Sequence, residues 1–298
     1  NNPYELTEDE RAVMNSLSAS IINSERLQTH IRYMFSHGAL YKRINGNLLF
    51  HGCIPMDENG DFLPVDIYGA KCAGRALMDH LDKQIRASYF SPEKIKKYGK
   101  PGDLMWYLWL AKDSPLFGKE KMTTFERLFI DDKASHKEHV RPYYKLINSK
   151  EPCEKILREF GLDPSHSKIL NGHVPVKIKN GESPIKGGGL LYVIDGGISK
   201  AYQKQTGIAG YTFIFNSRFM ALAEHKPYEP LREDGTQKFF SPSMKTVDTL
   251  KTRMLVIDTD EGAELLRQAE AVKRLVEAYK TGEIKERPEG KYSAYKGK

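Results

Sequence analysis

Short apolar runs bounded by Gly and Pro predict buried β-strands in several parts of the chain. The runs are Leu48–Phe50, Ile169–Leu170, Leu190–Ile194 and Tyr211–Asn216. Because these runs are apolar on both faces, we expect them to share one layered sheet system with helices packed outside it. Phe219–Ala223 is placed to pair with the last run as a hairpin across Ser217-Arg218, and Met254–Ile257 is a further candidate strand.

Apolar residues at helical spacing predict helices between these strands. Thr7 and Glu10 have the spacing of a capping box, so the first helix should begin after Thr7. The other predicted helices run from Ser24 to Gly38, over residues 75–90, from Pro152 to Phe160, and onward from Thr259. Helices and strands together predict a mixed α/β (α+β) fold.

Three segments carry expectations about packing. The last helix has an apolar stripe, which predicts a face packed against another element. The stripe consists of Leu265, Ala269, Val272, Val276 and Tyr279. The aromatic segment Met105–Leu110 holds both Trp residues, and we expect it to anchor a loop by packing, in preference to forming a sugar-stacking platform. Pro227–Thr246 is rich in Pro, Ser, Gly and charge, which is typical of a long loop.

Composition and charge narrow the class of protein. Hydrophobic residues make up 40% of the chain and the mean hydropathy is −0.55, as in soluble globular proteins. No apolar run has the roughly 18 residues of a membrane span, and three scattered cysteines favour a reducing, cytoplasmic setting. The net charge of +7 suits nucleic-acid binding or the attraction of an anionic substrate. No nucleic-acid motif accompanies it, so we expect most of this charge on solvated faces.

Two histidines stand out because their surroundings match. His51 and His173 each come at the end of an apolar run, and each lies beside a Gly. A lone His in a loop is more often a surface or core residue than a ligand. The paired context predicts a site where both imidazoles reach one Zn, Mn or Fe ion, with the two ring nitrogens about 3–4 Å apart. Asp195-Gly196-Gly197 follows a third predicted strand, where a ligand-binding edge and a simple tight turn are equally compatible with the sequence.

Longer sequence motifs around these residues resemble those of one protein family. They are NLLFHGCIPMD over residues 47–57, MWYLW over 105–109, SPLFGKEKMTTFE over 114–126, NGHVPVK over 171–177 and IDGGISKAYQKQTGIAGY over 194–211. Their order and content are similar to the class III fructose-1,6-bisphosphatases of the calcineurin-like metallophosphatase superfamily. One departure is Val174, where that family more often has Thr.

The resemblance implies a fold and indicates which residues belong to it. It implies the C-terminal portion of a calcineurin-like metallophosphatase β-sandwich flanked by helices, because the superfamily's Asp-x-His, Gly-Asp-x-x-Asp-Arg-Gly and Gly-Asn-His words do not occur in this sequence. We expect residues 1–282 to form this portion, with a family-specific insertion around residues 60–165. Residues 283–298 are expected to form a frayed tail.

The resemblance also implies an activity and a set of residues. The activity is hydrolysis of fructose 1,6-bisphosphate in gluconeogenesis by two divalent metals, expected to be Mn²⁺, with His51 and His173 as ligands of one of them. The catalytic groups are expected outside this chain. Candidate partners for substrate phosphate are Lys177, Lys200 and Arg127, followed by Lys119 and Lys121.

The expected partner is a sugar bisphosphate, with neither nucleic acid nor a membrane involved, and a homo-oligomer is compatible with the sequence. Two other functions stay open. One is a non-catalytic regulatory or assembly module derived from a metallophosphatase. The other is nucleic-acid binding, which only the charge suggests.

Overall fold

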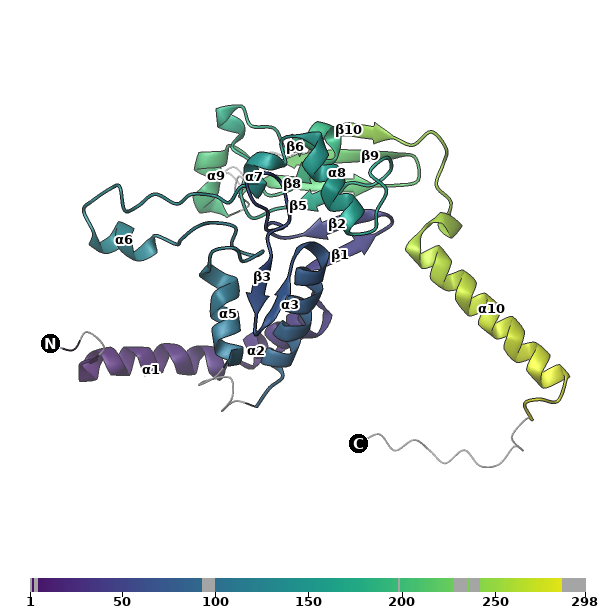
Figure 1. Cartoon of the computed structure of the whole chain (residues 1–298), viewed down its shortest axis with the longest axis horizontal. Coiled ribbons are helices and arrows are strands. Elements are labelled where there is room, and N and C mark those ends of the chain that lie inside the picture. Colours follow the sequence, from purple (N-terminus) through teal and green to yellow (C-terminus); the bar gives the residue numbers. More distant parts are fainter. Residues whose placement is uncertain are drawn as a thin grey trace. The chain divides into compact units, whose positions relative to one another are not determined.

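The chain divides into two compact units. The structure is a computed structural model and describes residues 5–92, 100–197, 199–227 and 242–285, with the single positions Asn2 and Gly235. One unit comprises residues 1–213 and 223–243, and the other comprises residues 214–222 and 244–298. Figure 1 shows the elements of both. The expected frayed tail, residues 283–298, lies mostly outside the described residues.

A five-stranded mixed sheet forms the centre of the first unit. Its strand order is β1-β2-β5-β7-β6. The strands are β1 (Tyr41–Ile44), β2 (Asn47–Phe50), β5 (Ile169–Asn171), β6 (Ile185–Lys186) and β7 (Leu191–Val193). The three central strands β2, β5 and β7 are parallel, whereas β1 and β6 run antiparallel to their neighbours. Because parallel strands end at the same edge, the residues that follow β2, β5 and β7 are brought together.

Burial explains why the central strands form. Leu48, Ile169 and Leu191 are fully buried and stand beside one another in register. β1 and β2 form a hairpin through Asn45 and Gly46, which both have positive φ, as a two-residue turn of type I′ requires. The three expected strands of this region are therefore confirmed, and so is the mixed α/β class.

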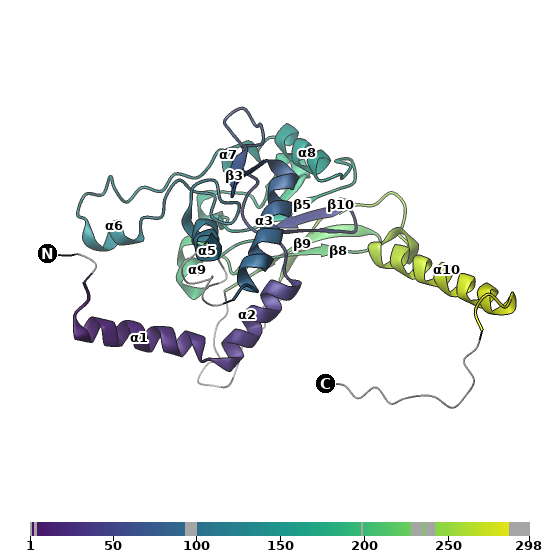
Figure 2. The ribbon, with the colours of Figure 1, turned by 60° about the horizontal axis from the view of Figure 1, so that its bottom comes forward.

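The helices of the first unit contain the four that were expected there, namely those after Thr7, from Ser24, over residues 75–90 and from Pro152, together with others that were not expected. They include α1 (Glu8–Ile22), α2 (Glu25–His37), α3 (Gly74–Tyr89), α5 (Lys100–Leu110), α6 (Thr124–Phe129), α7 (Tyr143–Leu146), α8 (Lys150–Glu159) and α9 (Lys200–Thr206). The capping box of α1 is present, with Thr7 and Glu10 bonded to each other's backbone N–H. In both Figure 1 and Figure 2, α3 lies against α2 and α5. No helix among the described residues is long and apolar enough to cross a bilayer.

The segment between β2 and β5 contains most of these helices and the small hairpin of β3 (Val65–Ile67) and β4 (Ala70–Cys72). Arg86 of α3 fixes the entry into the central sheet. Its guanidinium donates to the carbonyls of Phe35 and Gly38 at the end of α2 and pairs with Asp82. Asp82 in turn accepts from the N–H of Leu40, just before β1. That this segment is a family-specific insertion stays a prediction.

The expectation for the aromatic segment Met105–Leu110 is wrong. Its residues belong to α5, where Leu104 and Leu108 are the buried side chains. Trp106 and Trp109 are each 59% exposed. The reason is helical geometry: positions 104 and 108 lie on one face, and the two indoles, in a T-shaped contact, lie away from it.

The remaining elements follow Gly210. β8 (Gly210–Phe215) and β9 (Phe219–His225) join across Ser217-Arg218 as expected and form a three-stranded sheet, in the order β10-β9-β8, with β10 (Ser243–Thr249). The expectation of a loop over Pro227–Thr246 is therefore wrong for its last four residues, because residues 243–246 belong to β10. Most of its other residues lie outside the described part.

Two further expectations are wrong in the second unit. Met254–Ile257 is no strand, because a 3₁₀ turn (η3, Val256–Asp258) forms there, and the Asp258 carboxylate accepts the N–H of Leu255. The last helix, α10 (Asp260–Lys280), is capped as expected by Thr259, whose hydroxyl accepts the N–H of Gly262. Its apolar stripe is exposed, however, and Gly262 is its buried residue. A helical apolar pattern defines a face but not the element that covers it.

Candidate metal centre

Three polar side chains follow the parallel strands at one edge of the central sheet. His51 comes directly after β2, His173 two residues after β5, and Asp195 two residues after β7. The sheet therefore brings together groups that are far apart in the sequence. The N–H of Gly172 donates to the carbonyl of His51 (2.9 Å) and joins the first two loops directly.

The two imidazoles face each other. Nε2 of His51 lies 3.1 Å from Nδ1 of His173, and the rings meet at 70° with centroids 4.9 Å apart. The expected proximity, about 3–4 Å between ring nitrogens around one ion, is confirmed. Metal binding itself stays a prediction.

A backbone carbonyl fixes the orientation of His173. Its Nε2–H donates to the carbonyl of Phe117 at 2.7 Å, which leaves the lone pair of Nδ1 directed towards His51. Metal-binding histidines commonly hold their second ring nitrogen in this way. His173 also has φ of 70°, a left-handed conformation that costs a non-glycine residue about 1–3 kcal/mol and is typical of functional sites.

The surroundings of His173 favour its neutral imidazole. Burial lowers its pKa, and the electrostatic interactions with His51 and Lys119 lower it further, while the Phe117 carbonyl and Asp195 oppose the shift. A neutral imidazole has the free lone pair that a metal ligand needs.

Gly52 allows the Phe117 loop to approach. A Cβ on Gly52 would lie 2.3 Å from the carbonyl oxygen of Pro115, far inside van der Waals contact. The N–H of Cys53 donates to that same oxygen at 2.9 Å. The glycine next to His51 thus positions the loop that carries the carbonyl partner of His173.

The described residues supply two metal ligands here. No group of three or more His, Cys, Asp or Glu side chains that could hold an ion occurs among them. The Asp195 carboxylate accepts the N–H of Gly197 at 2.8 Å, as in a tight turn, and lines a cavity of about 630 Å³ that also includes both imidazoles. Two imidazoles fit two positions on one divalent ion, and a pair of metals needs a bridging carboxylate in addition.

A larger cavity of about 810 Å³ adjoins the imidazole pair. Its wall is mostly apolar and includes Trp109, and its polar groups include Lys119, Arg127 and Glu138. The structure therefore places two of the candidate phosphate partners, Arg127 and Lys119, in one cavity with His51 and His173. Volumes of about 300–1,000 Å³ are typical of ligand sites.

Two other candidate residues with described side chains, Lys177 and Lys121, lie outside this cavity. Lys177 is exposed, and in the described part of the chain it does not line this cavity. Lys200 is the first residue of α9, and its side chain lies outside the described part. Lys121 donates to the carbonyl of Ser135 at 3.0 Å.

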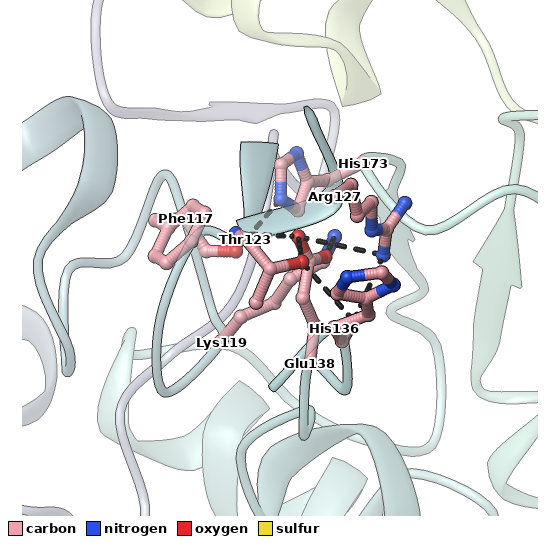
Figure 3. A network of polar contacts seen from close by, with 7 residues as sticks. All are labelled: Phe117, Lys119, Thr123, Arg127, His136, Glu138 and His173. Atoms are coloured by element: carbon pink, nitrogen blue, oxygen red, sulfur yellow. Dashed lines mark hydrogen bonds and ion pairs between the residues drawn. The ribbon is translucent and has the colours of Figure 1, made fainter. Parts of the chain in front are cut away.

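Glu138 organises the polar side of the larger cavity (Figure 3). It accepts hydrogen bonds from Lys119 Nζ at 2.7 Å and from both the N–H and the hydroxyl of Thr123 at 3.0 Å. Arg127 Nη2 lies 3.7 Å from the same carboxylate and donates to the carbonyl of His136 at 3.4 Å. Burial works against ionisation, but Lys119 and Thr123 outweigh it and lower the pKa of Glu138 to about 2. Glu138 was not among the residues expected from the sequence, since no local motif marks its pairing with Lys119, 19 positions away.

Comparisons with known proteins found a matching family model and similar curated proteins. The family model described as Firmicute fructose-1,6-bisphosphatase matches residues 1–281. A relative from Clostridium botulinum (strain Langeland), named fructose-1,6-bisphosphatase class 3, is 48% identical over 294 residues, which cover 97% of this chain and 43% of the relative. A relative of the same name from Fusobacterium nucleatum is 47% identical over 287 residues, covering 95% of this chain and 44% of the relative. The chain thus spans less than half the length of these relatives. No solved structure matches the chain.

Proposed function

The chain belongs to the Firmicute fructose-1,6-bisphosphatase family, and from this premise we propose that its protein hydrolyses fructose 1,6-bisphosphate to fructose 6-phosphate and phosphate, a step of gluconeogenesis. The observation that carries the proposal is the 48% identity over 97% of the chain to a relative of that name. Because the chain spans 43% of that relative, we assign to it one part of an active site. We place the protein in the cytoplasm, where its three free thiols would stay reduced.

We further propose that His51 and His173 hold a divalent metal, in the first place Mn²⁺. The fit rests on the facing ring nitrogens and on the Phe117 carbonyl, which holds the second nitrogen of His173. When bound, such a metal supplies Lewis-acid activation of a phosphate ester. A bridging carboxylate and the catalytic acid belong, in this proposal, to the portion of the relatives that this chain does not span, as in a calcineurin-like metallophosphatase.

The residues of this chain then have three tasks. His173 offers a neutral lone pair to the metal, and Phe117 holds its ring in place. Lys119 and Arg127 attract an anionic substrate into the cavity next to the imidazole pair. Lys177 and Lys200 stay candidate phosphate partners.

The test of the metal site is a titration of the chain with Mn²⁺, followed by electron paramagnetic resonance. His51→Ala and His173→Ala should each lose the binding that the unchanged chain shows. His166→Ala removes an exposed histidine and is the matched control, which should bind as the unchanged chain does. Equal binding by all variants would refute the assignment of the two ligands.

A second candidate function is a non-catalytic regulatory or assembly module. The observation in its favour is that the described residues provide no third ligand for the ion. The same titration separates the two functions, because a module should bind Mn²⁺ no better than the double variant His51→Ala/His173→Ala. Hydrolysis of fructose 1,6-bisphosphate by the full-length protein would show that the protein is an enzyme and not a non-catalytic module.

A further inference from the structure

The polar cluster of Lys119, Arg127 and Glu138 carries an excess of positive charge. Two cations surround one carboxylate, and the carboxylate is ionised at neutral pH because its pKa is about 2. The cluster therefore has a net charge of about +1, on the wall of a cavity large enough for a ligand.

The guanidinium of Arg127 has donors to spare. Its side chain is 56% exposed, and among the described residues it makes both of its contacts through Nη2, at 3.4 and 3.7 Å. Nε and Nη1 are therefore available to a ligand in the cavity. Each of these donors can form a charge-assisted hydrogen bond with a phosphate oxygen.

Lys119 is held more firmly. Its Nζ lies 2.7 Å from Glu138, and the two hydrogen bonds from Thr123 fix that carboxylate in turn. Glu138 therefore positions the ammonium before any ligand arrives, which lowers the entropic cost of binding. A preorganised point charge next to a free guanidinium is a typical pair for a phosphate monoester.

The cluster is directly connected to the candidate metal centre. Phe117, whose carbonyl holds His173, is two residues before Lys119 on the same loop. Lys119 and His173 also line the same cavity. One ligand with two phosphates can therefore place one at the imidazole pair and the other at the cluster.

We propose that Lys119 and Arg127, positioned by Glu138, form a second phosphate subsite, which binds the phosphate group that is retained in the product. This inference rests on the proposed function, since only a bisphosphate substrate has a group that remains. It assigns Lys119 and Arg127 to binding and Glu138 to positioning. The ligand class is a phosphate monoester of a sugar.

The direct test is binding of fructose 6-phosphate to this chain without metal, measured by isothermal titration calorimetry. The unchanged chain should bind fructose 6-phosphate, and it should bind fructose at least tenfold more weakly. Arg127→Met should lose about tenfold in affinity for the phosphate, the equivalent of one hydrogen bond to a charged group. Arg127 is the residue of choice, because its exposed side chain can be replaced without leaving a buried charge unpaired.

Arg158→Met is the matched control. Arg158 is also an exposed arginine paired with a glutamate, at 2.9 Å from Glu154, and it does not line the cavity in the described part of the chain. It should bind fructose 6-phosphate as the unchanged chain does. Failure of the unchanged chain to bind the phosphate, or an equal loss in both variants, would overturn the subsite.

A second measurement separates this inference from the proposed function. In the full-length protein, Arg127→Met should raise KM for fructose 1,6-bisphosphate about tenfold, and more than it raises KM for fructose 1-phosphate, which lacks the retained group. Equal effects on both substrates would overturn the subsite. A full-length protein that hydrolyses neither substrate would refute the proposed function, and the titration of the chain would still decide on the subsite.

Discussion

Replacing Gly52 by Ala should destabilise the candidate metal centre, whereas the same change at Gly172 should not. A Cβ at Gly52 would lie 2.3 Å from the Pro115 carbonyl oxygen, which is far inside van der Waals contact. The backbone at Gly52 or at Pro115 must therefore move. Overpacking of this kind typically costs about 1–3 kcal/mol. A Cβ at Gly172 would lie 3.4 Å from the nearest atom, Cβ of Asp195, which is ordinary contact.

The comparison of the two glycines isolates the clash. Both variants remove the same backbone freedom from the unfolded chain, a gain of about 0.4–1 kcal/mol that cancels between them. The difference between the two free energies of unfolding should therefore be about 1–3 kcal/mol, with Gly52→Ala the less stable. Urea unfolding followed by circular dichroism measures it as a midpoint lower by roughly 0.5–1 M. Equal midpoints would show that the Pro115 loop yields freely and that Gly52 does not position it.

Three further outcomes are expected. In the full-length protein, His51→Ala and His173→Ala should each reduce activity by at least a hundredfold and leave thermal melting nearly unchanged; a variant of normal activity would contradict the ligand assignment. The 298-residue chain alone with Mn²⁺ should show little bisphosphatase activity, and robust turnover by a chain of confirmed mass would disprove the assignment of the other ligands elsewhere. The pKa of Glu138 falls from its ordinary 4.5 to about 2 on folding. The ionised carboxylate therefore stabilises the folded chain fully above about pH 5, and this contribution is lost as the pH falls towards 2. Unfolding midpoints of Glu138→Gln should therefore depend less on pH in this range than those of the unchanged chain.

The imidazole pair could be predicted from the sequence because each half of it is marked locally. An apolar run, a histidine and a glycine recur at both places, and parallel pairing of two buried strands brings their ends together. The cluster around Glu138 has no such mark. Its partners Lys119 and Arg127 are ordinary surface types, and only the course of the loop between α5 and α7 brings them together.

The packing errors have a common physical cause. Periodicity placed the stripe of α10 on one helical face, and aromatic content suggested packing for Met105–Leu110, but neither signal contains information about what covers such a surface. In α5 the helix turns its leucines inward and its two Trp side chains outward. Met254–Ile257 shows the complementary error, because a short apolar run followed by Asp258 formed a capped turn in place of a strand.

The pairing of β2 with β5 has a consequence for the order of folding. The hairpin of β1 and β2 closes over two residues, Asn45 and Gly46, and is a local event. Leu48 and Ile169, by contrast, are 169 − 48 = 121 positions apart in the chain. Contacts of such separation are made late, because the entropy of closing the loop is lost before the contact forms. In a chain that has formed only its local hairpins, His51 and His173 are still far apart. The two imidazoles therefore come together only when the long-range pairing of β2 with β5 is complete.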